Sequence, residues 1–302
     1  MNDFTYRSHN CGQLRPADQG KDVCLCGWVQ YNRGGRFLSL RDSYGITQLV
    51  VPDAAANDQL TSKIIEKIPL ESVVFAKGIV KRRPNGQENK HMATGDVEVI
   101  LSDLKVIGEA NSSLPFLIRS QNKPKEPLRL KHRYLDLRTK EMQYNLRLRS
   151  QFVSRVREFF NAYGFVEVET PSLFKETPGG AQEFVVPTQE KSKFYSLVQS
   201  PQQMKQLLIM GGIDRYYQIA RCYRDEGTKE DRQPEFTQID VELTFARRSH
   251  IMNLIEQLLL NSWPPSAGKI RLPFPRITYA DAIKHYGTDK PDVRFDMRVS
   301  IV

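Results

Sequence analysis

The hydrophobic periodicity of this chain changes about one third of the way along it, and this change limits the possible folds more than any other feature. Apolar residues alternate with polar ones between Cys11 and Gly108, which is the period of β-strands. From Met142 onwards apolar residues recur at helical spacing. Several prolines fall in the segment between the two patterns and disfavour regular elements there. The sequence therefore predicts a multidomain α+β chain with a domain at 1–108, a linker at 109–134 and a second domain at 135–302.

The composition narrows the function classes only modestly. A chain of 302 residues is long enough for two hydrophobic cores, and its net charge of +9 favours a polyanionic partner. The four cysteines show no CxxC spacing, so we expect reduced thiols, with no metal site and no disulfide framework. No apolar run approaches the roughly 20 residues that span a membrane. The first residues resemble neither a signal peptide nor a transit peptide, so the sequence carries no readable address.

Five strand-like runs and one helix-like run make up the first domain. This pattern, within about 100 residues, outlines an OB-fold β-barrel. An SH3-like barrel or a small sandwich gives a similar pattern, so the periodicity alone leaves the choice open. The helix-like run covers residues 56–68, and the strand-like runs cover residues 22–30, 36–42, 46–51, 72–80 and 97–101.

One face of this domain carries a candidate nucleic-acid contact. Phe37 alternates with Leu38 and Leu40, so parity favours the two leucines as core residues and Phe37 as an outward residue. An outward aromatic ring flanked by cations suits a stacked, unpaired base. The alternative is that Phe37 belongs to the core. The candidate surface consists of Arg33, Phe37, Arg41 and Gln48.

The second domain opens with a long amphipathic helix at 142–163, followed by a strand at 165–171. Such a pair suits a dimer interface and equally suits an ordinary packed helix, and the sequence does not decide between them. A further helix begins near Ser200, which we predict to be its N-cap, with Pro201 at the first helical position.

Two polar residues of that helix, Gln202 and Lys205, share one face. They could hold a carboxylate there, although on spacing alone a solvent-exposed face is the commoner outcome.

A polar hairpin is the most unusual feature of the second domain. Strand-like runs at 214–226 and 232–242 are joined by a short polar connection with one glycine. Alternation places Phe236, Gln238 and Asp240 on one face, so an aromatic ring, an amide and a carboxylate would line one pocket. Arg224 beside them supplies a planar fork for phosphate or carboxylate. The alternative is an edge hairpin with a solvated, charged turn.

Several segments carry a family resemblance. Arg221-Cys-Tyr-Arg-Asp-Glu with Arg232-Gln-Pro-Glu-Phe-Thr-Gln-Ile-Asp resembles motif 2 of class II aminoacyl-tRNA synthetases. Residues 165–171 with the preceding helix resemble motif 1. The stretch Phe194-Tyr-Ser-Leu-Val-Gln-Ser-Pro-Gln-Gln-Met-Lys-Gln-Leu-Leu and the stretch Arg133-Tyr-Leu-Asp-Leu-Arg narrow the resemblance to aspartyl enzymes of the bacterial and mitochondrial type. Cys24-Leu-Cys-Gly-Trp-Val resembles their anticodon-binding OB domain. Lysyl and asparaginyl enzymes are less similar.

The resemblance implies an aspartate–tRNA ligase, which joins aspartate to ATP as aspartyl-adenylate and then transfers the amino acid to tRNA-Asp. It implies an OB-fold barrel followed by a partial class II catalytic domain built on an antiparallel sheet. The implied cofactors and partners are ATP, Mg²⁺, L-aspartate, tRNA-Asp and a second copy of the chain, which would form a homodimer through motif 1.

The resemblance also implies site residues. The catalytic residues would be Arg224, Glu226 and Asp240. The ATP site would comprise Arg224, Asp225, Glu226, Gln233 and Phe236. The aspartate site would comprise Ser200, Gln202, Gln203, Met204, Lys205, Arg224, Gln238 and Asp240. The anticodon contacts would be Arg33, Phe37, Gln48 and Glu98.

The chain departs from the family pattern in two ways. Gly179 stands where bacterial relatives carry a glutamate near the substrate ammonium, which favours the mitochondrial subgroup and leaves open whether Glu183 serves nearby. Nothing matches motif 3 or the inserted domain, so the sequence resembles the N-terminal half of such an enzyme, with most Mg²⁺ ligands elsewhere. We therefore expect little activity from these residues alone. The alternative is a non-catalytic product that binds tRNA or forms dimers. The subgroup implies the mitochondrial matrix, or the cytoplasm for a bacterial source.

Overall fold

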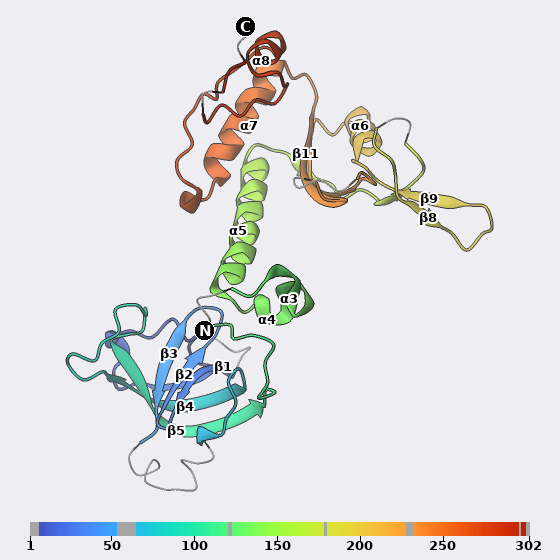
Figure 1. The fold of residues 1–302 in the computed structure, drawn as a ribbon. Helices are drawn as coiled ribbons and strands as arrows, with labels where there is room; N and C mark the ends of the chain where they lie inside the picture. Colours follow the sequence, from blue (N-terminus) through green and yellow to red (C-terminus); the bar gives the residue numbers. More distant parts are fainter. Residues whose placement is uncertain are drawn as a thin grey trace. The chain divides into compact units, whose positions relative to one another are not determined.

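The structure is a computed structural model that describes residues 6–52, 65–119, 123–177, 180–227, 232–295 and 297–299. Contacts between residues divide the chain into two compact units, Met1–Leu146 and Arg147–Val302 (Figure 1). Each unit is described by itself below. The division falls inside the long helix, so the expected linker groups with the first unit.

The first unit is built on five strands that close into a barrel in the order β1-β2-β3-β5-β4 (Figure 1). The barrel closes because β4 pairs with β1 as well as with β5, and all pairings are antiparallel except that of β3 with β5. The expected helix at 56–68 lies mostly outside the described residues. The strands are β1 (Asp22–Arg33), β2 (Phe37–Arg41), β3 (Ile46–Val50), β4 (Val73–Arg82) and β5 (Val97–Gly108).

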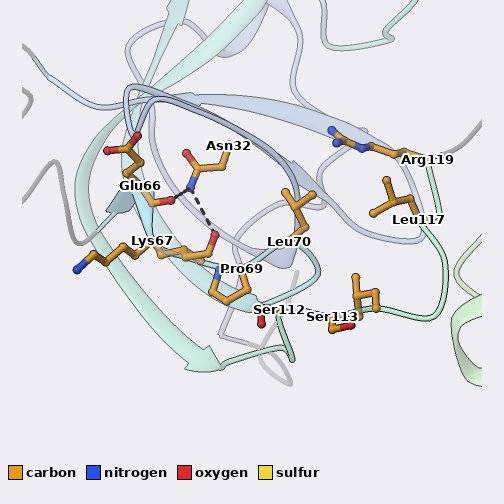
Figure 2. A pocket seen from close by; sticks show the side chains of 11 residues that line it. Asn32, Glu66, Lys67, Pro69, Leu70, Ser112, Ser113, Leu117 and Arg119 are labelled. Carbon is orange, nitrogen blue, oxygen red and sulfur yellow. Dashed lines mark hydrogen bonds between the residues drawn. The ribbon is translucent and has the colours of Figure 1, made fainter.

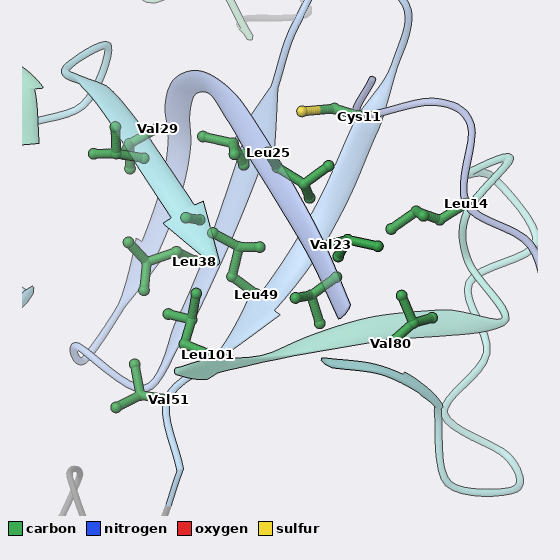
Figure 3. Packing of buried hydrophobic residues seen from close by; sticks show 14 of the residues in the cluster. Cys11, Leu14, Val23, Leu25, Val29, Leu38, Leu49, Val51, Val80 and Leu101 are labelled. Carbon is green, nitrogen blue, oxygen red and sulfur yellow. The ribbon is translucent and has the colours of Figure 1, made fainter. Parts of the chain in front are cut away.

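Strand alternation fills the interior of this barrel. Leu38 and Leu40 of β2 are fully buried, as the parity of the sequence predicts, and they pack with apolar residues of the other four strands (Figure 3). Side chains from the segment before β1, Cys11 and Leu14, complete this core. Burial raises the pKa of the Cys11 thiol far above its ordinary value.

Charged residues cover one outer part of the barrel. The carboxylate of Glu71 pairs with Arg41 at 2.6 Å and with Arg138 at 3.1 Å, and the Arg138 guanidinium lies over the Trp28 ring. Arg138 follows two short helices, α3 (Glu126–Lys131) and α4 (Arg133–Asp136). Between Pro16 and Asp18 a 3₁₀ helix, η1, precedes the barrel.

The second unit contains a three-stranded sheet in the order β11-β10-β6. The hairpin of β10 (Arg215–Tyr223) and β11 (Glu235–Leu243) is antiparallel, as expected. The expected strand at 165–171 is much shorter, because only β6 (Val166–Glu167) pairs, and it runs parallel to β10. The sheet is therefore mixed rather than antiparallel. A parallel pairing is possible here because a long crossover separates β6 from β10.

The long helix α5 (Lys140–Ala162) packs on one face of this sheet through its last turns. Val156, Phe159 and Phe160 are buried, and the Phe160 ring stacks on Tyr217 of β10 with centroids 4.6 Å apart. The helix ends where Gly164 adopts a φ of +73°, which favours glycine.

A second small sheet in the order β7-β9-β8 precedes α6 (Gln202–Met210). The prediction that Ser200 caps α6 is wrong, because Pro201 is the N-cap and no side chain caps the helix. A proline at this position costs no hydrogen bond, since the first amides of a helix have no intrahelical partner. The remaining elements are β7 (Leu173–Phe174), β8 (Val185–Pro187), β9 (Phe194–Leu197), α7 (Arg248–Ser262), the 3₁₀ helix η2 (Pro265–Ala267) and α8 (Tyr279–Tyr286).

Candidate functional site

The two faces of the β10–β11 hairpin differ in chemistry. Opposed residues of an antiparallel pair share a face, and the register pairs Gln218 with Asp240, Ala220 with Gln238 and Cys222 with Phe236. The other face, which carries Tyr217, packs on α5. The expected polar face therefore exists, and the hydrophobic core uses the opposite face.

Lys205 of α6 reaches this polar face and pairs with two carboxylates. Its Nζ lies 3.1 Å from Asp240 Oδ1 and 3.2 Å from Glu242 Oε2. Lys205 is 8% exposed and Asp240 is 7% exposed, so neither charge is solvated as it would be at the surface. Buried charges of this kind persist only when they are paired. The commoner surface interpretation of the α6 lysine is therefore wrong.

Asp240 has acceptor capacity that the fold does not use. Its Oδ2 atom is buried and has no hydrogen-bond partner among the described residues. Burial raises the pKa of Asp240 above its ordinary value, and the hydrogen bond from Lys205 offsets only part of that rise. A ligand that donates a hydrogen bond from a cation would stabilise the ionised form.

Arg224 and Phe236 form the second part of the candidate site. The Arg224 guanidinium lies 5.1 Å from the centre of the Phe236 ring, and its buried Nε donates to none of the described residues. Next to them, Glu226 accepts a hydrogen bond from Arg232 at 2.6 Å. A planar cation beside an aromatic plate matches the chemistry of a phosphate next to a purine.

The other residues implied for the site lie at its margins. Gln238 accepts a hydrogen bond from the Cys222 thiol at 2.8 Å. Gln202 and Gln233 are exposed, and so is the side chain of Asp225. Ser200, Gln203 and Met204 are half-buried around the start of α6. Gly179 lies outside the described residues.

Three residues of this region were not foreseen. Glu242 follows Asp240 by two positions in β11 and therefore lies on the same face, so strand alternation could have predicted its place in the site. Arg232 was quoted only as part of a motif, although its charge complements Glu226. Gln199 bonds both backbone groups of Ala181, a contact that no local pattern predicts.

The outer face of the barrel brings together most of the residues expected to contact an anticodon. Phe37 is 36% exposed, with the Arg36 guanidinium over its ring, and β1 pairs Arg33 with Phe37. Gln48 donates a hydrogen bond to Glu98 at 3.0 Å.

Arg41 does not belong to this exposed surface, because it is buried against Glu71. A cation that the sequence did not indicate, Arg119, lies 4.2 Å from the centre of the Tyr31 ring.

A separate pocket of 620 Å³ lies beside the barrel within the first unit (Figure 2). Asn32 crosses one side of it and donates hydrogen bonds to the carbonyl oxygens of Ile65 and Glu66. No residue expected for a site lines this pocket. Its polar groups stabilise the turn before β4 and carry no functional assignment.

The described part of the chain holds no group of three His, Cys, Asp or Glu side chains placed to bind a metal. Its helices include none with the length and apolar content that a membrane crossing requires.

Comparisons with known proteins match both halves of the chain. Residues 125–301 match the family model of class II tRNA synthetases (D, K and N), and residues 23–107 match an OB-fold nucleic acid binding domain. The chain is 52% identical over 302 residues to the mitochondrial aspartate–tRNA ligase of Bos taurus, covering 99% of this chain and 46% of that protein. It is 45% identical to the aspartate–tRNA(Asp/Asn) ligase of Thermotoga neapolitana, covering 97% and 50%.

Two solved structures are also similar. The aspartyl-tRNA synthetase of Entamoeba histolytica matches with a TM-score of 0.73 and 25% identity, over 89% of this chain and 60% of that one. The asparaginyl-tRNA synthetase of Pyrococcus horikoshii, complexed with asparaginyl-adenylate, matches with a TM-score of 0.72 and 27% identity, over 84% and 57%. The chain spans about half the length of the curated relatives it matches.

Proposed function

This chain belongs to the class II tRNA synthetases (D, K and N), and on that premise we propose that it carries the adenylate-forming half-site of an aspartate–tRNA ligase. In this function ATP and L-aspartate form aspartyl-adenylate, and the amino acid then passes to tRNA-Asp. The observation that carries the proposal is the buried Lys205, which lies between Asp240 and Glu242.

The Lys205–Asp240 pair has the charges that free aspartate requires. The Lys205 ammonium would pair with the side-chain carboxylate of the substrate, and the free Asp240 Oδ2 would accept from its amino group. Asparagine offers no negative charge to Lys205, so it would gain less from this ammonium than aspartate gains, and the pair would favour aspartate.

Arg224 and Phe236 would hold the nucleotide. The guanidinium would neutralise charge at the α-phosphate while the aspartate carboxylate attacks it, and the Phe236 ring would stack on adenine, with Asp225, Glu226 and Gln233 around them. Class II synthetases generally use Mg²⁺ with ATP. The described residues hold no group of three His, Cys, Asp or Glu side chains that could bind this metal together.

The OB-fold domain would bind tRNA-Asp. Phe37 would stack on an anticodon base, and Arg33, Gln48 and Glu98 would surround it.

The remaining assignments rest on likeness to relatives. A homodimer through motif 1 would use α5 and β6. The mitochondrial matrix is the proposed compartment, because mitochondrial ligases from Bos taurus and Homo sapiens are among the relatives. The alternative compartment is the cytoplasm, because bacterial ligases are also among the relatives.

A binding experiment tests this function without requiring turnover. We expect the chain to bind a non-hydrolysable aspartyl-adenylate analogue more tightly than its asparaginyl counterpart in calorimetry, by about tenfold or more. Lys205→Met should abolish the preference. Lys193→Met, which changes an exposed lysine of the same unit, should retain it. Equal binding of the two analogues by the unmodified chain would contradict the assignment to aspartate.

A second readout separates the ligase from the non-catalytic alternative. We expect little aspartate-dependent exchange of pyrophosphate into ATP from these residues alone, so the second readout is tRNA binding compared with analogue binding. tRNA binding without analogue binding would support the alternative.

A further inference from the structure

Residues 180–183 make hydrogen bonds on two sides, and these bonds connect the two parts of the candidate site. On one side, the Gln199 side chain accepts from Ala181 N at 2.8 Å and donates to Ala181 O at 2.7 Å. On the other side, Gln182 O accepts from Asp225 N at 2.8 Å. Gln199 directly precedes the segment that leads into α6, and Asp225 directly follows Arg224.

A further backbone bond closes these contacts into a ring. Tyr223 N donates to Val198 O at 3.0 Å, next to Gln199. The ring runs from Gln199 through residues 181–182 to Asp225, back along the chain to Tyr223, and through Val198 to Gln199. Its segments are joined to one another by hydrogen bonds. Hydrogen bonds arranged in such a network support one another, so the loss of one bond is expected to weaken the others.

Glu183 holds the Gln199 side chain in place. Its Oε1 accepts from Gln199 Nε2 at 3.0 Å, from Thr177 N at 3.0 Å and from the Thr177 hydroxyl. Burial raises the pKa of this carboxyl, but hydrogen bonds from Thr177, Ser196 and Gln199 outweigh burial and hold the pKa below its ordinary value. Glu183 is therefore ionised at neutral pH and orients the Gln199 amide, with its Nε2 toward two acceptors.

The backbone at Gly180 shows how close this contact is. Gly180 has a φ of +104°, and a Cβ built there would lie 2.7 Å from Gln199 Oε1. Only glycine adopts this conformation without strain and leaves room for the amide.

We propose that Gln199 and Glu183 are positioning residues, which use residues 180–183 as a bridge to fix the spacing between Arg224 and the Lys205 helix. This inference rests on the proposed function, since it assigns aspartate to the Lys205 side and ATP to the Arg224 side. The bridge makes occupation of one side favour the geometry of the other, because both sides share one hydrogen-bonded segment.

Amide hydrogen exchange on the full chain tests the bridge directly, with no ligand present. In Gln199→Ala we expect exchange to accelerate by about tenfold at Ala181 N–H and also at Asp225 N–H, although Asp225 contacts neither Gln199 nor its substitute. Gln182→Ala is the matched control. It removes another glutamine side chain of the same segment but keeps the carbonyl that Asp225 uses, so protection at Asp225 should not change.

A negative charge introduced at position 199 provides a readout that a purely structural role would not give. In Gln199→Glu two carboxylates face each other, so protection of Asp225 N–H relative to the unmodified chain should be poor at pH 8. It should recover as the pH falls and one carboxyl gains a proton. The double variant Gln199→Glu/Glu183→Gln restores a donor between the two side chains. We expect it to recover part of the protection at pH 8, because the repulsion between the two carboxylates is removed while Ala181 O still lacks the donor that Gln199 supplies.

Three outcomes overturn the bridge: unchanged Asp225 exchange in Gln199→Ala, no pH dependence in Gln199→Glu, or no rescue in the double variant. Calorimetry with the aspartyl-adenylate analogue then links the bridge to function, and Gln199→Ala should bind about tenfold more weakly than Gln182→Ala. Equal affinity of these two variants would also overturn it. Failure of the proposed function has a different signature, because the unmodified chain would then not bind the analogue while the exchange results stayed as expected.

Discussion

Each unit of this molecule holds a cluster of three charged residues, two of them buried and one half-buried, and the two clusters have opposite composition. In the first unit one carboxylate, Glu71, lies between two cations, Arg41 and Arg138. In the second unit one cation, Lys205, lies between the two carboxylates of Asp240 and Glu242. The two clusters are shielded from solvent to a similar degree. They differ in the sign of their net charge and in which groups pair with their charged atoms.

The fold pairs most of the charges in the positive cluster, which consists of Glu71, Arg41 and Arg138. Arg138 covers the Trp28 ring, and the carboxylate of Glu71 has two partners, although Arg41 Nη1 finds none among the described residues. The negative cluster consists of Lys205, Asp240 and Glu242, so it has one cation for two carboxylates. Asp240 Oδ2 has no hydrogen-bond partner among the described residues. A fold that only needed stability would avoid such an acceptor. The second cluster is therefore suited to a cationic group from a ligand, whereas the first serves the barrel.

The largest change in the free energy of unfolding is expected when Lys205 is replaced. Lys205→Met leaves the buried Asp240 and the half-buried Glu242 without their shared cation, so the free energy of unfolding of the second unit should fall by about 3–5 kcal/mol at pH 7. Each unit has one tryptophan, Trp28 or Trp263, so denaturant unfolding in a Trp28→Phe background reports the second unit alone.

The same variant should respond to pH in a defined direction. Without Lys205 the folded-state pKa of Asp240 rises further above its unfolded value, so the folded state binds the proton more tightly. The variant should then lose stability as pH rises from the unfolded-state pKa of Asp240 to its folded-state pKa. It should regain stability towards pH 4. A deficit that does not change with pH would show that the cost is packing rather than charge.

A smaller effect is expected for the matching change in the first unit. Arg41→Met leaves Glu71 paired with Arg138 at 3.1 Å, so we expect a loss of about 2 kcal/mol. Trp28 fluorescence in a Trp263→Phe background measures it. If Arg41→Met cost as much as Lys205→Met, the two clusters would be equivalent and the comparison would fail.

The sequence predicted those features whose signal is local. The period of two in β2 and β11 places Leu38 inside the barrel and puts Phe236, Gln238 and Asp240 on one face. Alternation is a property of the strand itself, so no knowledge of distant contacts is needed.

Features that depend on distant partners were missed. Arg41 has the parity of an outward residue but is buried, because Glu71, thirty positions later, covers it. Lys205 was expected in solvent on spacing alone, and its burial depends on how α6 packs beside β11. The parallel pairing of β6 with β10 is likewise set by a long crossover, which periodicity cannot show.

The response to acid is a further difference between the two units. Burial raises the pKa of Asp136, but Arg129 and Arg133 outweigh burial and hold the pKa below 3.8. A lowered folded-state pKa contributes stability above pH 3.8, which is lost as pH falls through the folded value. Asp136→Asn should therefore cost the first unit about 1–2 kcal/mol at pH 7. The deficit should vanish in strong acid, in the same direction as the recovery of Lys205→Met but at lower pH, because the pKa of Asp136 is lowered whereas that of Asp240 is raised. Denaturant unfolding at a series of pH values measures it, and a deficit that grows in acid would contradict the assignment.

The smallest effect on stability is expected on the outer face of the barrel. Phe37→Ala should change the free energy of unfolding by less than about 1 kcal/mol, because the ring is already 36% exposed. The same change should weaken tRNA binding by about fivefold to a hundredfold in filter binding, the usual range for losing one base stack. Leu38→Ala, one residue along the strand, is the matched control, and about 3 kcal/mol of barrel stability should be lost there. If Phe37→Ala behaved like Leu38→Ala and left tRNA binding of the folded protein intact, Phe37 would be a core residue and the barrel would bind RNA elsewhere.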